Sequence, residues 1–182
     1  MTMIIEMTHA QLLQEWRLRY LHEPVNDDCP YTRHDGIDID RLLAGKMRDW
    51  YLDLLDNAPL SMLAPMEIHD RITNQIADDE GCLVFKLPDE CRRLTAVRAE
   101  GWTRDAAITA DLSSRTAQLQ LSPYTRGDTH HPVAVIDNRE VRLYSVKPGS
   151  AAKVEKLLAI VDTPGIYRFD EKALSTIPSP DF

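Results

Sequence analysis

The most chemically suggestive segment of the sequence is Asp162-Thr163-Pro164-Gly165, which follows an apolar, strand-like run. GTPases have a similar strand end, with an Asp near Mg²⁺ and a Gly whose backbone approaches the γ-phosphate. Such a loop works only beside a phosphate cradle of the form G-x-x-x-x-G-K-[ST], whose backbone N–H groups surround the phosphates. The nearest candidate, Gly45-Lys46, is followed by Met47 and has Asp40 where the first glycine should stand. We therefore interpret DTPG as a strand end with a Pro-Gly turn and expect no nucleotide cofactor.

A second polar cluster lies in RGDTHHP, which contains Asp128, His130 and His131. Carboxylate and imidazole groups are zinc ligands, and a catalytic zinc needs three protein ligands and an open position. With His34 as a further ligand, these residues support one hypothesis, a small metal- or thiol-dependent hydrolase. Neighbouring side chains on an extended backbone point to opposite sides, however, so the two histidines are poorly placed to share one ion. We therefore favour a solvated loop and expect no metal site.

The three cysteines, Cys29, Cys82 and Cys91, are an odd number without C-x-x-C spacing. Free thiols in a reducing compartment, buried as small apolar side chains, are the expected result, although Cys29 could join the histidines at a metal. The sequence also lacks the motifs H-E-x-x-H, G-x-S-x-G and G-x-G-x-x-G, so we expect no catalytic residue and no cofactor. The three tryptophans are interpreted as core or interface anchors, namely Trp16, Trp50 and Trp102.

The composition is typical of a globular protein, with 182 residues, 43% of them apolar, and a formal charge of −8. This length suits one domain, or one domain with an appendage, and is large enough to bury a core without a metal or disulfide. The negative charge argues against a broad nucleic-acid-binding face, where Lys and Arg would be in excess. We recognise no secretory signal and no apolar run of 18 residues, so no membrane partner is expected.

The first 78 residues predict an α-helical part. Thr8 and Gln11 form a capping-box pattern at the start of a helix in residues 8–21. A second helix is predicted within residues 37–59, where apolar residues recur every three to four positions after an Asp that can cap it. A third, within residues 67–78, places three isoleucines on one stripe: Ile68, Ile72 and Ile76.

From Gly81 onward the pattern changes to that of β-strands. The segments GCLVFKLP and RLTAVRAEGW each predict a strand, and residues 133–145 predict a hairpin around the turn DNRE. In residues 151–161 the composition suits a helix, but the length, the β-favouring tail and the Pro-Gly stop favour a strand from about residue 154 to 161. Residues 105–122 predict a strand with an irregular crossing. We expect the hairpin and the 154–161 strand to present exposed edges that a monomer must protect.

The order of these elements predicts an α+β fold, with an N-terminal helical unit followed by an antiparallel β-rich half. The expected parts are a helical part at 1–78, a β-rich part at 79–165, and a short helical turn and tail at 166–182. We expect these parts to form a single compact unit.

Two stretches of the β-rich half are distinctive, CLVFKLPDECRRLTAVRAEGWTRDA and HHPVAVIDNREVRLYSV. A strand ends in Leu-Pro-Asp, an Arg-Leu link follows, a second strand ends at Trp-x-Arg, and Pro-Val then precedes a turn and Leu-Tyr-Ser. Over residues 37–161 this pattern resembles small structural proteins of Bacteroidetes phages and prophages, including crAss-like phages. Cys91 stands where that pattern has a Phe. The matching positions are Leu87, Pro88, Asp89, Arg93, Leu94, Trp102, Arg104, Pro132, Val133, Leu143, Tyr144 and Ser145.

The resemblance implies a head–tail adaptor or connector ring component at the portal–tail junction of a virion. In such adaptors a helical bundle carries an inserted β-region, and the last helix of the bundle would here be reduced to DEKALSTI. The implied partners are further copies of this chain in a closed ring, phage portal and tail proteins, and DNA in passive contact within a channel. The implied location is the virion, and the bacterial cytoplasm during assembly. Ring closure by rotation requires heterologous contacts, which paired strand edges can supply.

Overall fold

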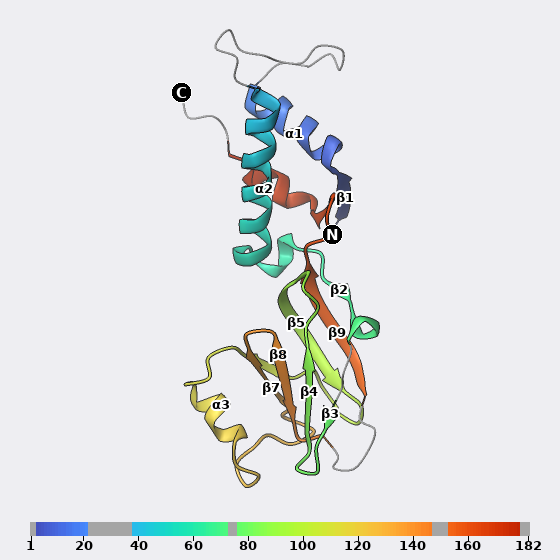
Figure 1. The fold of residues 1–182 in the computed structure, drawn as a ribbon, viewed down its shortest axis with the longest axis vertical. Coiled ribbons are helices and arrows are strands. Elements are labelled where there is room, and N and C mark those ends of the chain that lie inside the picture. Colours follow the sequence, from blue (N-terminus) through green and yellow to red (C-terminus); the bar gives the residue numbers. More distant parts are fainter. Residues whose placement is uncertain (1–2, 22–37, 73–75, 147–152, 179–182) are drawn as a thin grey trace. The chain divides into compact units, whose positions relative to one another are not determined.

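The computed structural model describes residues 3–21, 38–72, 76–146 and 153–178, which fall into two compact units (Figure 1). The terminal unit consists of Met1–Ala64 together with Asp162–Phe182, and the inserted unit consists of Pro65–Val161. The N-terminal helices precede a strand-rich, mostly antiparallel part, which confirms the predicted α+β fold. The chain divides after Ala64 and after Val161, whereas boundaries after residues 78 and 165 were expected, and the residues form two compact units where one was expected. The C-terminal segment folds with the N-terminal helices.

In its described residues, the terminal unit contains two α-helices, a two-stranded sheet and two 3₁₀ turns. Its elements are β1 (Ile4–Thr8), α1 (His9–Leu21), α2 (Ile39–Asn57), η1 (Leu60–Met62), β10 (Ile166–Asp170) and η3 (Glu171–Thr176). Both predicted α-helices are confirmed, and so is the short helical turn near the C-terminus. The strands β1 and β10 were not predicted, because each is short and each depends on a partner far away in the sequence.

Both helices begin at the caps that the sequence indicates. At the start of α1, the N–H of Thr8 donates to Oε1 of Gln11 at 2.8 Å, and the N–H of Gln11 donates to Oγ1 of Thr8 at 3.3 Å. This reciprocal pair is the predicted capping box. At the start of α2, Oδ1 of Asp38 accepts the N–H of Arg41 at 3.1 Å. Each cap satisfies backbone donors that have no partner within the helix.

Aromatic rings hold the terminal unit together. The β1 and β10 strands pair antiparallel, from Ile4 opposite Asp170 to Thr8 opposite Ile166. Phe169 on β10 is fully buried, and its ring lies 5.6 Å from that of Trp50 and 6.2 Å from that of Tyr51. These edge-on and tilted arrangements are the ones that aromatic quadrupoles favour. The two ends of the chain therefore share one core.

The part of the inserted unit that the structure describes contains two sheets, one α-helix and one 3₁₀ turn. Its elements are β2 (Met66–Glu67), η2 (His69–Arg71), β3 (Ile76–Ala77), β4 (Cys82–Lys86), β5 (Cys91–Ala99), β6 (Ala107–Thr109), α3 (Arg115–Gln120), β7 (Val133–Asp137), β8 (Glu140–Tyr144) and β9 (Val154–Val161). One sheet has the strand order β2-β9-β5, and the other has the order β3-β4-β8-β7-β6. All strand pairs are antiparallel except β6 with β7, which is parallel. One cluster of mostly aliphatic side chains from both sheets forms the core of this unit.

Four predicted strands are confirmed in the inserted unit: β4, β5, and the β7–β8 hairpin. The strand β9 has the predicted bounds, residues 154–161. The helix expected in residues 67–78 is wrong, since this stretch holds β2, the 3₁₀ turn η2 and β3. Tertiary pairing decides here, because β2 joins β9 and Oε1 of Glu67 accepts the N–H of Leu157 at 2.7 Å. In residues 105–122 the strand is β6, whereas the helix α3 was not predicted.

The hairpin strands β7 and β8 and the strand β9 were expected to lie at exposed sheet edges, and this expectation is wrong. The β7, β8 and β9 strands each have a neighbour on both sides, although β2 pairs only with Leu158 and Ala159 of β9, and β6 only with residues 133–135 of β7. The outermost strands of the described sheets are instead β1, β2, β3, β5, β6 and β10. Of these, β5 pairs with β9 through three register shifts, and such bulges make a strand a poor template for pairing with another chain.

Candidate interaction surface

The outer edge of β1 presents backbone groups that its sheet does not use. The N–H of Glu171 donates to the carbonyl of Met3 at 2.9 Å. Hydrogen-bonded pairs alternate along two antiparallel strands, so the backbone groups of Met3, Ile5 and Met7 point toward β10. In agreement, the N–H of Arg168 opposite Glu6 turns away from β1 and donates to the hydroxyl of Tyr51 at 3.1 Å. The N–H and C=O groups of Ile4 and Glu6 therefore point away from β10, and β10 is the only strand paired with β1 in the described sheets.

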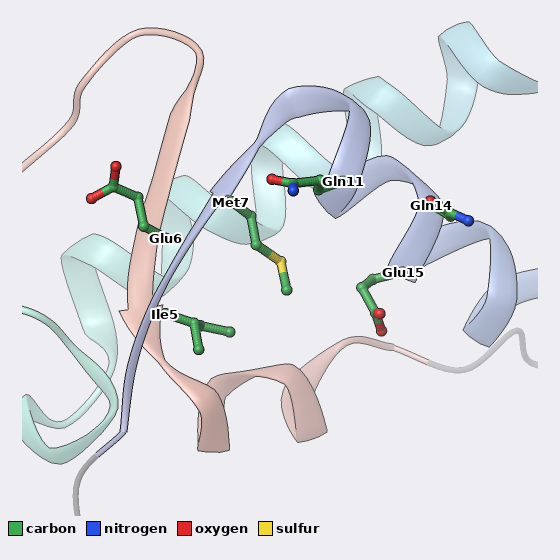
Figure 2. Close-up of a pocket in the computed structure, with 6 residues that line it drawn as sticks. All are labelled: Ile5, Glu6, Met7, Gln11, Gln14 and Glu15. Carbon is green, nitrogen blue, oxygen red and sulfur yellow. The ribbon is translucent and has the colours of Figure 1, made fainter.

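A groove of about 380 Å³ runs between β1 and α1 (Figure 2). Its lining residues are Ile5, Glu6, Met7, Gln11, Gln14 and Glu15. Figure 2 shows the side chains of Ile5 and Met7 on the α1 side of the strand, and that of Glu6 on the opposite side. Ile5 and Met7 stand opposite buried Phe169 and Tyr167, so the groove opens onto the edge of the aromatic core. Both side chains are half-buried, and within the described sheets β1 has no second neighbouring strand that could cover them further.

The charged groups of the groove are carboxylates. Glu15 lines it from α1, Glu6 lines it from β1 with its side chain on the opposite side of the strand, and none of the lining residues is basic. Glu6 lies opposite Arg168 of β10, and Oε2 of Glu15 lies 3.7 Å from Nε of Arg19. The latter pair is long and exposed, and such pairs contribute little. Arg19 also donates from Nη1 to the carbonyl of Leu174 at 2.6 Å, which directs its guanidinium toward η3.

The signal for this surface is present in the sequence but brief. In Ile4–Thr8 the half-buried Ile5 and Met7 alternate with exposed residues, as in a strand with one covered face. The run is only five residues long and directly precedes a stronger helical pattern. Sequence reasoning missed it because a strand this short gains stability only from its partner, β10.

The DTPG segment forms the predicted turn. Gly165 has a φ of 76°, a conformation that favours glycine, and the N–H of Ile166 donates to the carbonyl of Thr163 at 3.2 Å. The carboxylate of Asp162 accepts hydrogen bonds from both terminal nitrogens of Arg48, with an Nη1–Oδ1 distance of 2.8 Å. This hydrogen bonding raises the pKa of the Arg48 guanidinium, although burial opposes the shift. The carboxylate thus joins the start of the C-terminal segment to α2.

The RGDTHHP segment is a loop held by its own polar groups. Oδ1 of Asp128 accepts the backbone N–H of His130 at 2.9 Å and that of His131 at 2.8 Å, and these bonds lower the pKa of this carboxyl. The two imidazoles have different partners. Nδ1 of His131 lies 3.3 Å from Asp128, whereas Nδ1 of His130 lies 3.1 Å from Oγ1 of Thr103. Across the described residues, no three His, Cys, Asp or Glu side chains are grouped to hold a metal ion. His34 and Cys29 lie outside the residues that the structure describes.

The thiols of Cys82 and Cys91 are poorly suited to nucleophilic chemistry at neutral pH. Cys82 is buried at the start of β4, and Cys91 is half-buried at the start of β5. Desolvation raises the pKa of each thiol from 9.0 to about 11. Because the thiolate is the nucleophile, both groups are protonated and unreactive near pH 7.

The positions shared with the phage pattern lie at the turns and the core of the inserted unit. Leu87, Pro88 and Asp89 form the link between β4 and β5, where the carbonyl of Pro88 accepts the N–H of Cys91 at 3.0 Å. Arg139, in the hairpin turn, also donates to this carbonyl, and its Nη1 lies 3.5 Å from Oδ1 of Asp89. The link is thus fastened to the β7–β8 turn.

The remaining shared positions are distributed along the strands and the loops between them. Trp102 is 6% exposed, and its Nε1 donates to the carbonyl of Ser145 at 3.2 Å, which supports its interpretation as an anchor. Leu143 is fully buried in β8, and Tyr144 is covered in part by the guanidinium of Arg126, 5.4 Å from its ring centroid. Arg93 and Leu94 lie in β5, Arg104 follows Trp102, and Pro132 directly precedes β7. These roles are structural, so the pattern describes a scaffold.

Comparison with known proteins identifies no family: no protein-family model matches the chain, and no curated protein is similar to it. Among the described helices, none has both the length and the apolar character needed to cross a membrane.

Proposed function

We propose that this chain is a virion structural protein of a tailed phage, acting as an adaptor or connector ring component at the portal–tail junction. In this role it has no catalytic site, and its partners are further copies of itself, the portal and the tail proteins. DNA passing through the channel of the ring would be in passive contact with it. The protein would be made in the bacterial cytoplasm and retained in the virion.

One observation carries the proposal, the insertion of the β-rich unit into the terminal unit. The chain leaves the terminal unit after Ala64, forms the two sheets, and returns at Asp162. The phage adaptors that the sequence resembles are expected to have the same arrangement, a helical bundle with an inserted β-region. The last helix of that bundle is here the 3₁₀ turn η3, which is a departure from the expected adaptor.

The places of the shared positions in the fold are a second observation in support of the proposal. Leu87, Pro88, Trp102 and Leu143 hold the β4–β5 link and the hairpin of the inserted unit in place. A pattern made of core and turn residues is preserved by the needs of a fold, and a fold by itself does not specify an activity. The resemblance therefore supports a shared scaffold, and the assembly role is our proposal by analogy with the proteins that the sequence resembles.

The test is deletion of the gene from the phage or induced prophage that encodes it. We expect filled or emptied heads that lack tails, and expression of the intact chain from a plasmid should restore infectious particles. Mass spectrometry of purified wild-type virions should detect the polypeptide in a fixed ratio to the portal protein. Infectious, tailed particles that lack this polypeptide would overturn the proposal.

Two variants of the inserted unit, one disruptive and one a control, test whether tail attachment needs this unit. Glu155 on β9 is largely exposed, and Arg98 on β5, 3.6 Å away, forms only a surface ion pair with it, so Glu155→Gln should leave folding and assembly intact. Trp102→Ala removes the anchor of the inserted unit, and plasmids carrying it should not restore tails. Full rescue by Trp102→Ala would contradict a role for the inserted unit in the virion.

A further inference from the structure

The outer edge of β1 has the properties of a strand-binding site. Ile4 and Glu6 direct two N–H and two C=O groups away from β10. An extended peptide can satisfy all four groups, which is the chemistry of β-strand addition. Where β1 meets α1, the side chain of Gln11 already binds the N–H of Thr8. The available edge is therefore short and ends at the capping box.

The groove beside this edge is the space that an added strand would use. Alternate side chains of such a strand would point to the α1 side, next to Ile5 and Met7 and across from Gln14 (Figure 2). Ile5 and Met7 are half-buried at the margin of the aromatic core, so apolar side chains placed there would complete their burial. The groove volume of about 380 Å³ is large enough for two or three aliphatic side chains.

The charges identify the kind of strand. On the face away from the groove, a residue opposite Glu6 would meet a carboxylate, and Glu15 on α1 adds a carboxylate to the lining of the groove itself. Opposite charges across a strand pair are stabilising, whereas like charges are not. A second copy of β1 offers no Lys or Arg, and the whole chain carries a formal charge of −8. A basic strand from another protein fits these charges better than a copy of this chain does.

We propose that the outer edge of β1 binds an extended segment of a different protein as a third strand, with apolar side chains in the β1–α1 groove and a Lys or Arg opposite Glu6. The occupant thus has apolar and basic residues in alternation. This inference stands on the edge and groove alone, and it does not depend on the proposed virion role.

The test uses the full chain and a blocked eight-residue peptide that alternates valine and lysine. Amide chemical shifts should change in β1 and the first turns of α1 when the peptide is added. A control peptide alternating valine and glutamate should bind much more weakly, because its carboxylates would face Glu6. No binding of the valine–lysine peptide at millimolar concentration, or equal binding of both peptides, would overturn the proposal.

Two variants separate backbone pairing from general attraction to an acidic surface. Glu6→Pro removes an outward N–H but no hydrogen bond to β10, and it should weaken peptide binding on the order of tenfold. Glu6→Gln keeps this N–H and removes only the charge, so it should weaken peptide binding less. Gln14→Trp fills the groove from the exposed side of α1 without altering β1, and keeps the test valid if Glu6→Pro does not fold. Binding that neither Glu6→Pro nor Gln14→Trp reduces would contradict the proposal. A wild-type dimer that Glu6→Pro converts to a monomer would assign the edge to a second copy of this chain and likewise contradict it.

Discussion

The two units of this protein are stabilised in different ways. The terminal unit brings together segments more than a hundred residues apart, and aromatic rings such as Trp16, Tyr51 and Phe169 fill its core. The inserted unit is one continuous segment, Pro65–Val161, with a core of mainly Val, Leu, Ile and Ala side chains on paired strands. Continuity of the chain should make the inserted unit independent, whereas the terminal unit requires both ends of the protein.

The polar contacts of the two units also reflect whether the unit is built from two sequence segments or from one. In the terminal unit, long-range side-chain bonds join the two sequence segments, for example Arg48 with Asp162 and Trp50 with Thr176, the latter at 3.0 Å. In the inserted unit, the polar bonds stay within one continuous segment, whether local, as Asp128 with the backbone of His131, or long-range, as Glu67 with Leu157. Loss of a chain end should therefore affect one unit and leave the other intact.

The largest expected effect is that of truncation. A chain ending at Val161 lacks β10 and η3, so the terminal unit should lose its sheet and aromatic core and fail to fold. The inserted unit, residues 65–161, should retain a dispersed amide spectrum and a cooperative thermal transition when produced alone. Loss of both units on truncation would show that they fold as one.

Single core substitutions should act on one unit at a time. Phe169→Ala in the terminal unit and Trp102→Ala in the inserted unit each delete a buried aromatic side chain, at a cost of ~3–5 kcal/mol of unfolding free energy. Calorimetry should then show one transition moved to lower temperature and the other unchanged. If each substitution lowers both transitions equally, the distinction between the units does not hold for stability.

A pair of glycine substitutions should have opposite signs in the two units. A Cβ at Gly127 would collide with the carbonyl oxygen of His131, so Gly127→Ala should destabilise the inserted unit by about 1–3 kcal/mol. Gly45 lies in α2, and apart from its chain neighbours and the backbone of its own helix, no atom of the described residues lies within 4 Å of the position that an alanine methyl group would occupy there. Gly45→Ala should therefore stabilise the terminal unit by ~0.5–1 kcal/mol. Chemical denaturation measures both, and a stabilising Gly127→Ala would contradict the tight packing of this loop.

A further expected effect concerns alkaline pH. The pKa of Cys82 and of Cys91 is about 11 in the folded inserted unit, against 9.0 for an unperturbed thiol. Below pH 9 the thiols are protonated in both states, and between pH 9 and 11 the unfolded chain releases its protons first, so stability falls as pH rises. The melting temperature of the inserted unit should fall in this range, and by less in a Cys82→Ala, Cys91→Ala variant. An equal fall in that variant would exclude the thiols as the cause.

Local chemistry in the sequence was enough to predict several elements. Capping residues and apolar periodicity located α1 and α2, because Thr8, Gln11 and Asp38 bind backbone groups within their own helix turns. The hairpin around Asn138 and the turn at Gly165 followed from residues that tolerate a positive φ, as both do here. Strand β9 was predicted with its observed bounds because Gly and Pro flank an apolar run of its length.

Only the tertiary structure decided which segments come together. The isoleucines Ile68 and Ile72 have a helical spacing, yet both are buried in the core of the inserted unit because β2 pairs with β9. The strands β1 and β10 are too short to be stable alone, and their pairing joins residues such as Ile5 and Phe169 across most of the chain. That pairing also creates the outer edge of β1 and its groove, since an edge exists only once a sheet has formed. Sequence patterns report bonds within a few residues, whereas the candidate site depends on contacts made after long loops close.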